Sequence, residues 1–506
     1  MHLRFSAPVA AAFLSACANG PSMSASHVDS PAPGTLAISP VQAGHLDRIR
    51  IDLTLAADMD GETVFLFPER WGPDENLGQL VSHRTVTDPV TGLPVPSETD
   101  DGRLTVASPP GQILRLSYQV QQDYQGLPQW GVQRMPGMRP VLQPDYASLI
   151  GHTFLPSLEG RDPEIEVTLA DFAQGAAFSQ PTRSDTSAAM PLSTAQDSVY
   201  ALGAFQFGDT GAGVRTAVLG EWRLSQEDIE TTTTNVLTLA GEAFQDAAFE
   251  DYFLTLTPLP DLPEGSSVIG TGLTQSFLLL ATRNAEPENL THTITHEILH
   301  EWITRRMGQT DEATDPARMW FTEGITEYYT QLVLLGSGET TLDDFIEALN
   351  TLWTEYNTST VNTLPAGDLI EHIWDSRETE RLPYQRGALL ALHWDTLARA
   401  EGRSLDDAIR ALLQSGNAAR ARGDTPVLTD AAIHAALEDA IGPRFKADFN
   451  TYVQTGEKLQ LKDLALPDCL TVVFPAGRHS WLARTPGADA AACRAQIAGA
   501  FAKPTE

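Results

Sequence analysis

The HExxH motif at residues 296–300 constrains this 506-residue chain more than any other feature. His296 and His300 lie at its two ends, and Glu297 follows the first histidine. Apolar spacing predicts a helix over about 291–307, and residues four apart on a helix lie on one face, about one turn from each other. Two imidazoles can then reach one metal ion, while Glu297 can take a proton from a nearby water. Because a lone HExxH also arises by chance, the hypothesis depends on the surrounding residues.

A catalytic zinc site usually has three protein ligands and leaves a position for water, so a third ligand is needed. The candidate favoured by position is Glu323, near the start of another predicted helix. His292, one turn before His296, competes with it. However, His292 and His300 would lie about 12 Å apart along a helix axis, whereas zinc–nitrogen bonds are about 2.1 Å long. We therefore expect His292 to be a neighbour of the site or a surface residue.

Glu327 lies one helical turn after Glu323. One interpretation is that its carboxylate accepts a hydrogen bond from a metal-binding histidine and orients the ring. The other is that it is an ordinary solvated carboxylate on the helix surface. The sequence leaves both interpretations open.

Periodicity divides the chain into two main regions. Apolar residues alternate with polar ones over 49–55, 114–120 and 165–169. This period of two predicts half-buried strands, and so a β-rich N-terminal domain over 41–190. Helical spacing dominates afterwards and predicts a mainly helical domain over 191–461. The fold class is therefore multi-domain α+β.

The helical region can be resolved further. Ser225 is a candidate N-cap for a helix that ends at Phe249, and the stretch 267–282 is expected to be a loop followed by a strand. Later helices are expected at about 342–357, 384–400, 404–415, 429–441 and 443–454.

Three segments of the chain share a pattern with a known group of enzymes. Residues 296–302, 320–329 and 384–389 have the sequences HEILHEW, WFTEGITEYY and YQRGAL. Together they resemble the glycyl aminopeptidase family of zinc metallopeptidases, which are gluzincins with HExxH and a downstream Glu-Gly helix. The similarity covers roughly 40–461 and is strongest over 291–400.

The resemblance implies a role for each matching residue. His296, His300 and Glu323 would bind one Zn²⁺ per chain, Glu297 would be the general base, and Tyr384 would donate a hydrogen bond to the oxyanion. It also implies a β-rich N-terminal domain followed by a thermolysin-like, mainly helical catalytic domain. From the residues alone, Tyr384 would be interpreted as a packing tyrosine at a helix start.

One segment departs from the family pattern. The family has a Gly-Gly-x-Glu-His segment on the strand beside the substrate, and the corresponding residues here include Gly272, Thr274 and Gln275. A carboxylate at the position of Thr274 pairs with the free amine of the substrate in related aminopeptidases. Its absence leaves an endopeptidase or dipeptidase as alternatives to an aminopeptidase. A non-catalytic zinc-containing module that binds envelope partners is a further alternative.

The N-terminus resembles an export signal. A basic start and a short apolar stretch end in Leu-Ser-Ala-Cys at 14–17, which looks like a bacterial lipoprotein box. This predicts a lipoprotein-type signal over 1–17 that is cleaved before Cys17, lipidation of Cys17 as the new N-terminus, a flexible tether over 18–40, and a location on the periplasmic face of the outer membrane or the cell surface. An ordinary signal peptide with a chance cysteine is the alternative.

The C-terminal segment 462–506 is too short for the PDZ domain that often ends family members. It contains Cys469 and Cys493, which can form a disulfide in an exported protein or remain two thiols. The charge of −33 argues against a nucleic-acid partner. No apolar run is long enough to span a bilayer, so membrane contact is expected only through a lipidated N-terminus. A peptide is the expected substrate, and the oligomeric state is not specified.

Overall fold

The computed structural model describes residues 32–71, 74–128, 138–179, 189–246, 251–262, 264–310, 314–476 and 479–502. The predicted signal segment and Cys17 lie outside these residues, as does most of the predicted tether. Within the described ranges, no helix is both long and apolar enough to cross a membrane.

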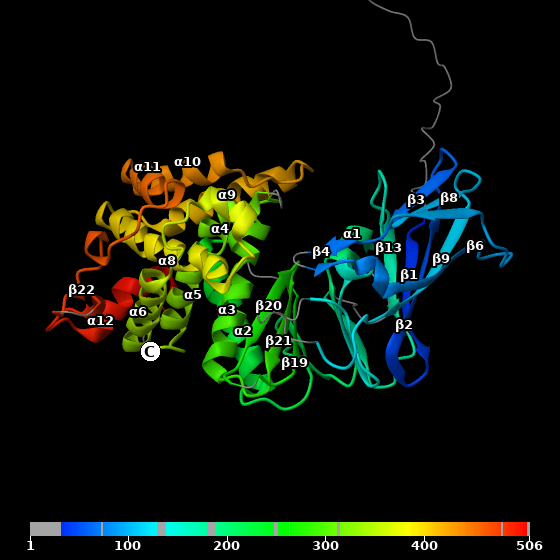
Figure 1. Cartoon of the computed structure of the whole chain (residues 1–506), viewed down its shortest axis with the longest axis horizontal. Helices are drawn as coiled ribbons and strands as arrows, with labels where there is room; N and C mark the ends of the chain where they lie inside the picture. Colours follow the sequence, from blue (N-terminus) through cyan, green and yellow to red (C-terminus); the bar gives the residue numbers. More distant parts are fainter. Residues whose placement is uncertain are drawn as a thin grey trace, which may run out of the picture. The chain divides into compact units, whose positions relative to one another are not determined.

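The N-terminal region contains a six-stranded sheet with the order β15-β13-β1-β2-β9-β6 (Figure 1). Along β2, Ile49, Ile51 and Leu53 are buried, whereas Arg50 and Asp52 point to the opposite face. The alternation therefore predicts this strand correctly. The strands are β1 (Gly34–Gln42), β2 (His45–Ala56), β6 (Val81–Thr87), β9 (Ile113–Gln121), β13 (Glu164–Leu169) and β15 (Met190–Pro191).

Two boundaries predicted for this region are wrong. The tether predicted for 18–40 is replaced by strand from Gly34 onward, because Leu36 and Ile38 are buried where β1 pairs with β2 and β13. The predicted end at 190 also falls too early. β16 (Val199–Gly203) pairs with β11 (Tyr146–Ile150) and β14 (Ala176–Phe178). With β10 (Val141–Leu142) they form a second, four-stranded sheet, β10-β11-β16-β14.

The remaining strands of this region form small sheets. β12-β3-β8-β7 is four-stranded, and β4 pairs with β5. The bounds are β3 (Glu62–Leu66), β4 (Arg70–Trp71), β5 (Asp74–Glu75), β7 (Ser97–Asp100), β8 (Arg103–Ala107), β10 (Val141–Leu142), β11 (Tyr146–Ile150), β12 (Ser157–Leu158) and β14 (Ala176–Phe178).

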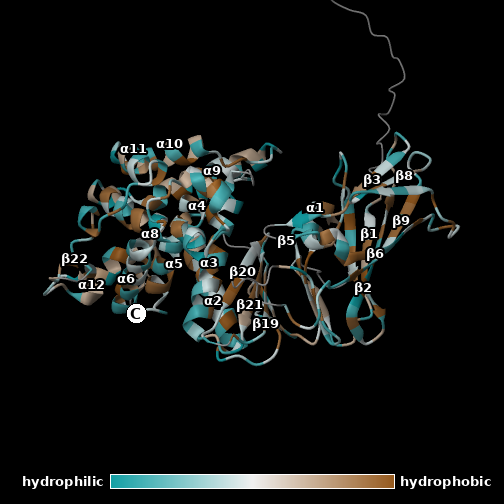
Figure 2. Cartoon of the chain, viewed as in Figure 1, coloured by the Kyte–Doolittle hydropathy of each residue, from teal (hydrophilic) through white to brown (hydrophobic). Residues whose placement is uncertain are grey.

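A five-stranded sheet, β17-β18-β19-β21-β20, follows. β18, β19 and β21 are parallel, and β20 is an antiparallel edge strand. The stretch 267–282, predicted to be a loop followed by a strand, is therefore a two-stranded hairpin of β20 and β21. Hydrophobic residues are concentrated on the strands and the helix faces that meet them (Figure 2). The strands are β17 (Gln206–Asp209), β18 (Val214–Val218), β19 (Tyr252–Leu259), β20 (Val268–Leu273) and β21 (Ser276–Thr282).

The C-terminal half is helical, as predicted. Ser225 caps α2, which ends at Phe244 rather than Phe249. α3 (Pro287–Leu299) lies between the β20–β21 hairpin and α5 (Figure 1). The other helices are α1 (Leu192–Gln196), α2 (Gln226–Phe244), α4 (Asp315–Thr322), α5 (Gly324–Ser337), α6 (Leu342–Thr358), α7 (Leu369–His372), α8 (Arg377–Ala400), α9 (Leu405–Ala421), α10 (Asp430–Ile441) and α11 (Arg444–Asp448).

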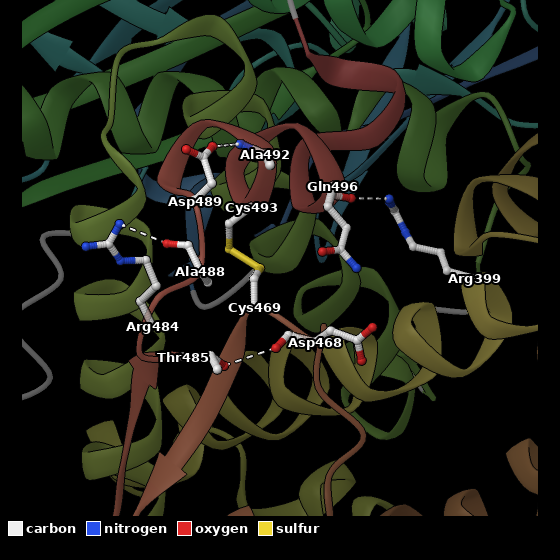
Figure 3. The surroundings of a disulfide bond; sticks show 10 residues. All are labelled: Arg399, Asp468, Cys469, Arg484, Thr485, Ala488, Asp489, Ala492, Cys493 and Gln496. Atoms are coloured by element: carbon white, nitrogen blue, oxygen red, sulfur yellow. Dashed lines mark hydrogen bonds between the residues drawn. A yellow bond between two sulfur atoms is a disulfide. The ribbon is translucent and has the colours of Figure 1, made fainter.

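The C-terminal appendage is joined to the helical core. It contains β22 (Leu470–Val473), β23 (Trp481–Arg484) and α12 (Ala490–Ala498). The predicted disulfide between Cys469 and Cys493 is present and joins the start of β22 to α12 (Figure 3). Arg399 of α8 donates a hydrogen bond to the carbonyl oxygen of Gln496 at 2.8 Å (Figure 3).

Candidate metal centre and active site

The helix that carries HExxH ends earlier than predicted. α3 ends at Leu299, and His300 is its C-cap. The following π-type turn is kinked, with φ −86° and ψ 84° at Ile303 and φ 123° at Thr304. The regular helix predicted to reach 307 is therefore wrong beyond His300. The sequence has no glycine or proline between His300 and 307 to signal a kink.

His296, His300 and Glu323 converge on one point. The Nε2 atom of His296 lies 3.2 Å from Oε2 of Glu323, and Nε2 of His300 lies 3.3 Å from the same oxygen. One ligand atom from each residue lies within 4.8 Å of the others. α3 supplies the histidines, and the junction between α4 and α5 supplies the glutamate.

These separations fit a zinc ion. Two atoms that are each about 2.1 Å from zinc and subtend the tetrahedral angle lie about 3.4 Å apart. Both nitrogen–oxygen distances to Glu323 are close to that value. Two imidazoles and one carboxylate also form a ligand set that catalytic zinc takes while keeping a position for water.

The other ring nitrogens of both histidines face groups that fix their orientation. Nδ1 of His296 lies 3.4 Å from Oε2 of Glu327. Nδ1 of His300 lies 3.4 Å from the carbonyl oxygen of Ile303, which the kink after α3 brings within reach. Each ring can donate its Nδ1 proton and leave Nε2 free for a metal. Glu327 thus lies where its carboxylate can accept a hydrogen bond from His296, and its side chain is buried rather than solvated.

His292 does not join the three converging residues. Its Nε2 atom lies 3.1 Å from Oε1 of Glu327, so that Glu327 bridges His292 and His296. This arrangement places His292 beside the site, on the same face of α3, and gives it a role in holding Glu327.

The charges of the site are strongly coupled. Burial acts to lower the pKa of His296, but hydrogen bonds to Glu323 and Glu327 raise it to about 10. Burial acts to raise the pKa of Glu323, but the charge of His300 and its hydrogen bonds hold it well below the usual range. A cation at Nε2 of His296 would therefore replace a proton that these carboxylates already stabilise.

Glu297 and Tyr384 line a pocket of about 460 Å³ together with His296. The ring of Tyr384 stacks on that of His296, with centroids 5.6 Å apart. Burial, together with the carboxylates of Glu323 and Glu297, raises the pKa of Tyr384 well above its usual range. Its hydroxyl therefore stays protonated at neutral pH and can donate a hydrogen bond.

The edge strand β20 forms another wall of this pocket through Val268, Ile269 and Gly270. A Cβ atom on Gly270 would lie 3.2 Å from Cγ of Glu297, and one on Gly272 would lie 3.6 Å from its Oε2 atom. At Gly270 such a Cβ atom would also overlap the ring of Phe277, whereas at Gly272 it would make only ordinary van der Waals contacts, so the lack of a side chain is required at Gly270 alone. Gly272 occupies the predicted position beside the site.

Thr274 and Gln275, predicted at the substrate edge, are placed differently. They form the two-residue turn between β20 and β21, where Leu273 pairs with Ser276. Neither lines the pocket. The backbone N–H of Thr274 donates to Asp197 at 2.9 Å, and Gln275 has φ 50°. The structure thus shows no contact of these two residues with the pocket, and their place at the substrate edge stays a prediction.

Two charged residues of the pocket wall, and one beside the β20–β21 turn, were not found from the sequence. At the turn, Asp197 also accepts a hydrogen bond from the hydroxyl of Thr274 and lies 3.6 Å from Nη1 of Arg305. Arg377 and Arg381 line the pocket, although the helix carrying them was predicted to start only at 384. A capping-box signal at Ser376 marks the true start of α8.

Comparisons with known proteins agree with the resemblance that the motifs predict. The family model described as M61 glycyl aminopeptidase matches residues 289–365. This segment contains HExxH, Glu323 and Glu327. A search of curated proteins found no match.

Solved structures match over a much longer part of the chain. An aminopeptidase N family protein from Idiomarina loihiensis has a TM-score of 0.69 at 14% identity, over 87% of this chain and 79% of that one. An M1 zinc metallopeptidase from Deinococcus radiodurans has a TM-score of 0.53 at 17% identity, over 85% and 95%. A mutant M1 zinc metallopeptidase from that organism, bound to a Tyr-Ser-Ala substrate, has a TM-score of 0.51 at 18% identity, over 84% and 94%. These matches confirm the predicted fold class.

Proposed function

We propose that this chain is a zinc-dependent peptidase and that it acts in the manner of an aminopeptidase. The observation that carries the proposal is the convergence of His296, His300 and Glu323 at zinc-binding separations beside a pocket lined by Glu297 and Tyr384. The match of 289–365 to the glycyl aminopeptidases and the solved metallopeptidases of the same fold support it.

Each residue has a distinct task in this proposal. His296, His300 and Glu323 hold the zinc ion, which lowers the pKa of water and polarises the scissile carbonyl. Glu297 accepts a proton from the attacking water and returns it to the leaving amine. The hydroxyl of Tyr384 donates a hydrogen bond to the oxygen on which negative charge develops.

The test replaces Glu297 with Gln, which keeps the shape of the side chain and removes the base. We expect kcat for peptide hydrolysis to fall by about 10²- to 10⁴-fold, while the bound zinc measured by elemental analysis stays at one per chain. Glu288→Gln, an exposed residue of the same helix α3, is the matched control. A chelator should abolish activity, and added zinc should restore it. Hydrolysis that survives both chelation and Glu297→Gln would contradict the proposal.

An endopeptidase or dipeptidase is the second candidate, because the described pocket does not include Thr274 or a carboxylate in its place. Peptides with free and acetylated N-termini separate these modes. Equal cleavage of both would favour an endopeptidase. A non-catalytic module has no use for the general base or the phenol, and the same assays would detect it as a zinc protein without hydrolysis.

A further inference from the structure

One face of helix α8 lines the pocket with charged side chains. Arg377, Glu380, Arg381 and Tyr384 all contribute to the pocket wall. The last three of these residues follow Arg377 by three, four and seven positions, which is the spacing of a single helical face. The uncharged strand β20 provides another wall. The arginines that line the pocket therefore lie on one side of it.

Arg381 lies over the ring of Tyr384, beside the metal centre. Its guanidinium lies 4.9 Å from the centroid of the Tyr384 ring, and that ring stacks on His296 at 5.6 Å. Nη2 of Arg381 is 3.9 Å from Oε2 of Glu355, but this oxygen already accepts a hydrogen bond from Gln385 at 3.0 Å. The ion pair is long and its partner is shared, so the charge of Arg381 is only weakly compensated.

Arg377 is exposed, and its side chain makes no hydrogen bond or ion pair with any residue that the structure describes. Glu380 lies between the two arginines and is partly buried. Burial raises the pKa of Glu380, against the opposite effect of the charges of Arg377 and Arg381. Even with Glu380 ionised, the α8 face keeps one surplus positive charge.

Glu327 and Glu297, the other two carboxylates of the pocket, already have a task. Glu327 is shared by His292 and His296. Glu297 is the proposed base of the reaction. The surplus charge on α8 is thus the part of the pocket wall whose compensation is weakest, since its one ion pair among the described residues, from Arg381 to Glu355, is long, in a chain whose net charge is −33.

We propose that Arg377 and Arg381 bind a carboxylate of the peptide substrate and thereby select for it. This inference rests on the peptidase function proposed above. A guanidinium matches a carboxylate with two parallel N–H···O hydrogen bonds, and stacking on Tyr384 limits the side-chain freedom that Arg381 loses on binding. The carboxylate is either the C-terminus of a short peptide or an acidic side chain close to the scissile bond.

Four matched peptides distinguish these two sources. Two differ only in a free or amidated C-terminus, and two differ only in Asp or Asn next to the scissile bond. For the wild-type protein with zinc, we expect kcat/KM to be about tenfold higher for the carboxylate member of one pair. Arg377→Gln and Arg381→Gln should each reduce this ratio, and the double variant should bring it to about one. Glu380→Gln should raise the ratio, because it removes a competing negative charge.

The ratio of kcat/KM between the two members of a pair separates recognition of the carboxylate from general damage to the site. A loss of activity that affects both members equally leaves this ratio unchanged. Arg422→Gln, on an exposed arginine paired with Asp424, is the matched control and should keep the wild-type ratio. Wild-type ratios of about one for both pairs would overturn the proposal. So would a ratio that the double variant leaves intact, or one that Glu380→Gln lowers.

Binding to the Glu297→Gln variant, measured by calorimetry, provides the same comparison without turnover. If none of the peptides is cleaved, the peptidase proposal fails, while the ratio of the dissociation constants still tests the arginine pair. If peptides are cleaved in a chelator-sensitive way but without a carboxylate preference, only the arginine proposal fails.

Discussion

Glu323 and Glu327 show how two identical side chains one turn apart acquire different tasks. Glu323 faces Nε2 of both motif histidines, whereas Glu327 faces Nδ1 of His296 and Nε2 of His292. Helix geometry alone places both carboxylates on one face of α5. Their division of labour depends on the distance between α3 and α5, which the sequence does not specify.

Replacing Glu327 with Gln should weaken zinc binding. The amide retains the size of the side chain but removes the negative charge that faces Nδ1 of His296, and loss of such a partner costs about 10- to 100-fold in metal affinity. We expect the dissociation constant for zinc, measured by competition with a chelating dye, to rise by this factor. Peptidase activity should recover at excess zinc.

The control for this variant is Glu339→Gln, because Glu339 is exposed just beyond the end of α5. An unchanged zinc affinity in Glu327→Gln would mean that the buried carboxylate only fills space.

His296, His300 and Glu323 could be proposed from sequence because their spacing carries the signal. The carbonyl oxygen of Ile303 could not, since its position depends on a kink without glycine or proline.

At the scale of helices and strands, the site depends on the close approach of α5 and α8. Gly324 and Gly387 meet where the helices cross, and a Cβ atom on Gly324 would lie 2.7 Å from the carbonyl oxygen of Pro383. This contact brings Glu323, at the start of α5, next to Tyr384 of α8. The sequence contains both glycines but does not show that they face each other.

Gly387→Ala should separate the two helices. A Cβ atom there would overlap the carbonyl oxygen of Trp320 and crowd Gly324. Such overpacking costs about 1–3 kcal/mol, which exceeds the gain of about 1 kcal/mol in helix propensity from Gly to Ala. We expect a lower free energy of unfolding in denaturant titrations, and a lower kcat because Tyr384 moves away from Glu323.

Gly367→Ala is the matched control, because a Cβ atom at Gly367 meets no atom within 4 Å. If Gly387→Ala matched this control in stability and kcat, the helices would have room that the structure does not show.

Turns are harder to predict from the sequence than these helices. The Thr274–Gln275 turn lacks the Asn-Gly or Asp-Gly signature of two-residue hairpins, so the sequence indicates a loop where the structure has a strand and a turn.

At the scale of the whole molecule, the similarity to known proteins extends much further in structure than in sequence. The family model matches only 289–365, whereas the fold matches over 87% of the chain at 14% identity. Cores accept many apolar side chains of similar volume, so a fold can persist while its sequence pattern fades. Residues that hold a metal have few substitutes. The motifs therefore predict the cluster of His296, His300 and Glu323, whereas the alternation that predicts the β-rich region misses its limits.

The C-terminal appendage packs against helices from earlier parts of the chain. Phe501 packs against Phe244 of α2 and Tyr329 of α5, with ring centroids 5.5 and 5.6 Å away. Arg494 donates to the carbonyl oxygen of Leu335 at 3.0 Å. The appendage thus contacts the far end of α5, the helix that begins next to Glu323. A disulfide with a sequence separation of 24 keeps it closed.

Replacing Cys469 and Cys493 together with Ala should therefore destabilise the protein without removing its metal site. Closing a loop of this length restricts the unfolded chain, and its loss costs about 3 kcal/mol in the chain-entropy model. We expect the Tm measured by calorimetry to fall by several degrees, with the zinc content unchanged at 25 °C. A reductant should lower the Tm of the wild type toward that of the double variant and leave the variant unaffected. A wild-type Tm that does not respond to reductant would mean that packing of Phe501 and Arg494 holds the appendage by itself, because the crosslink would then add nothing to the free energy of unfolding.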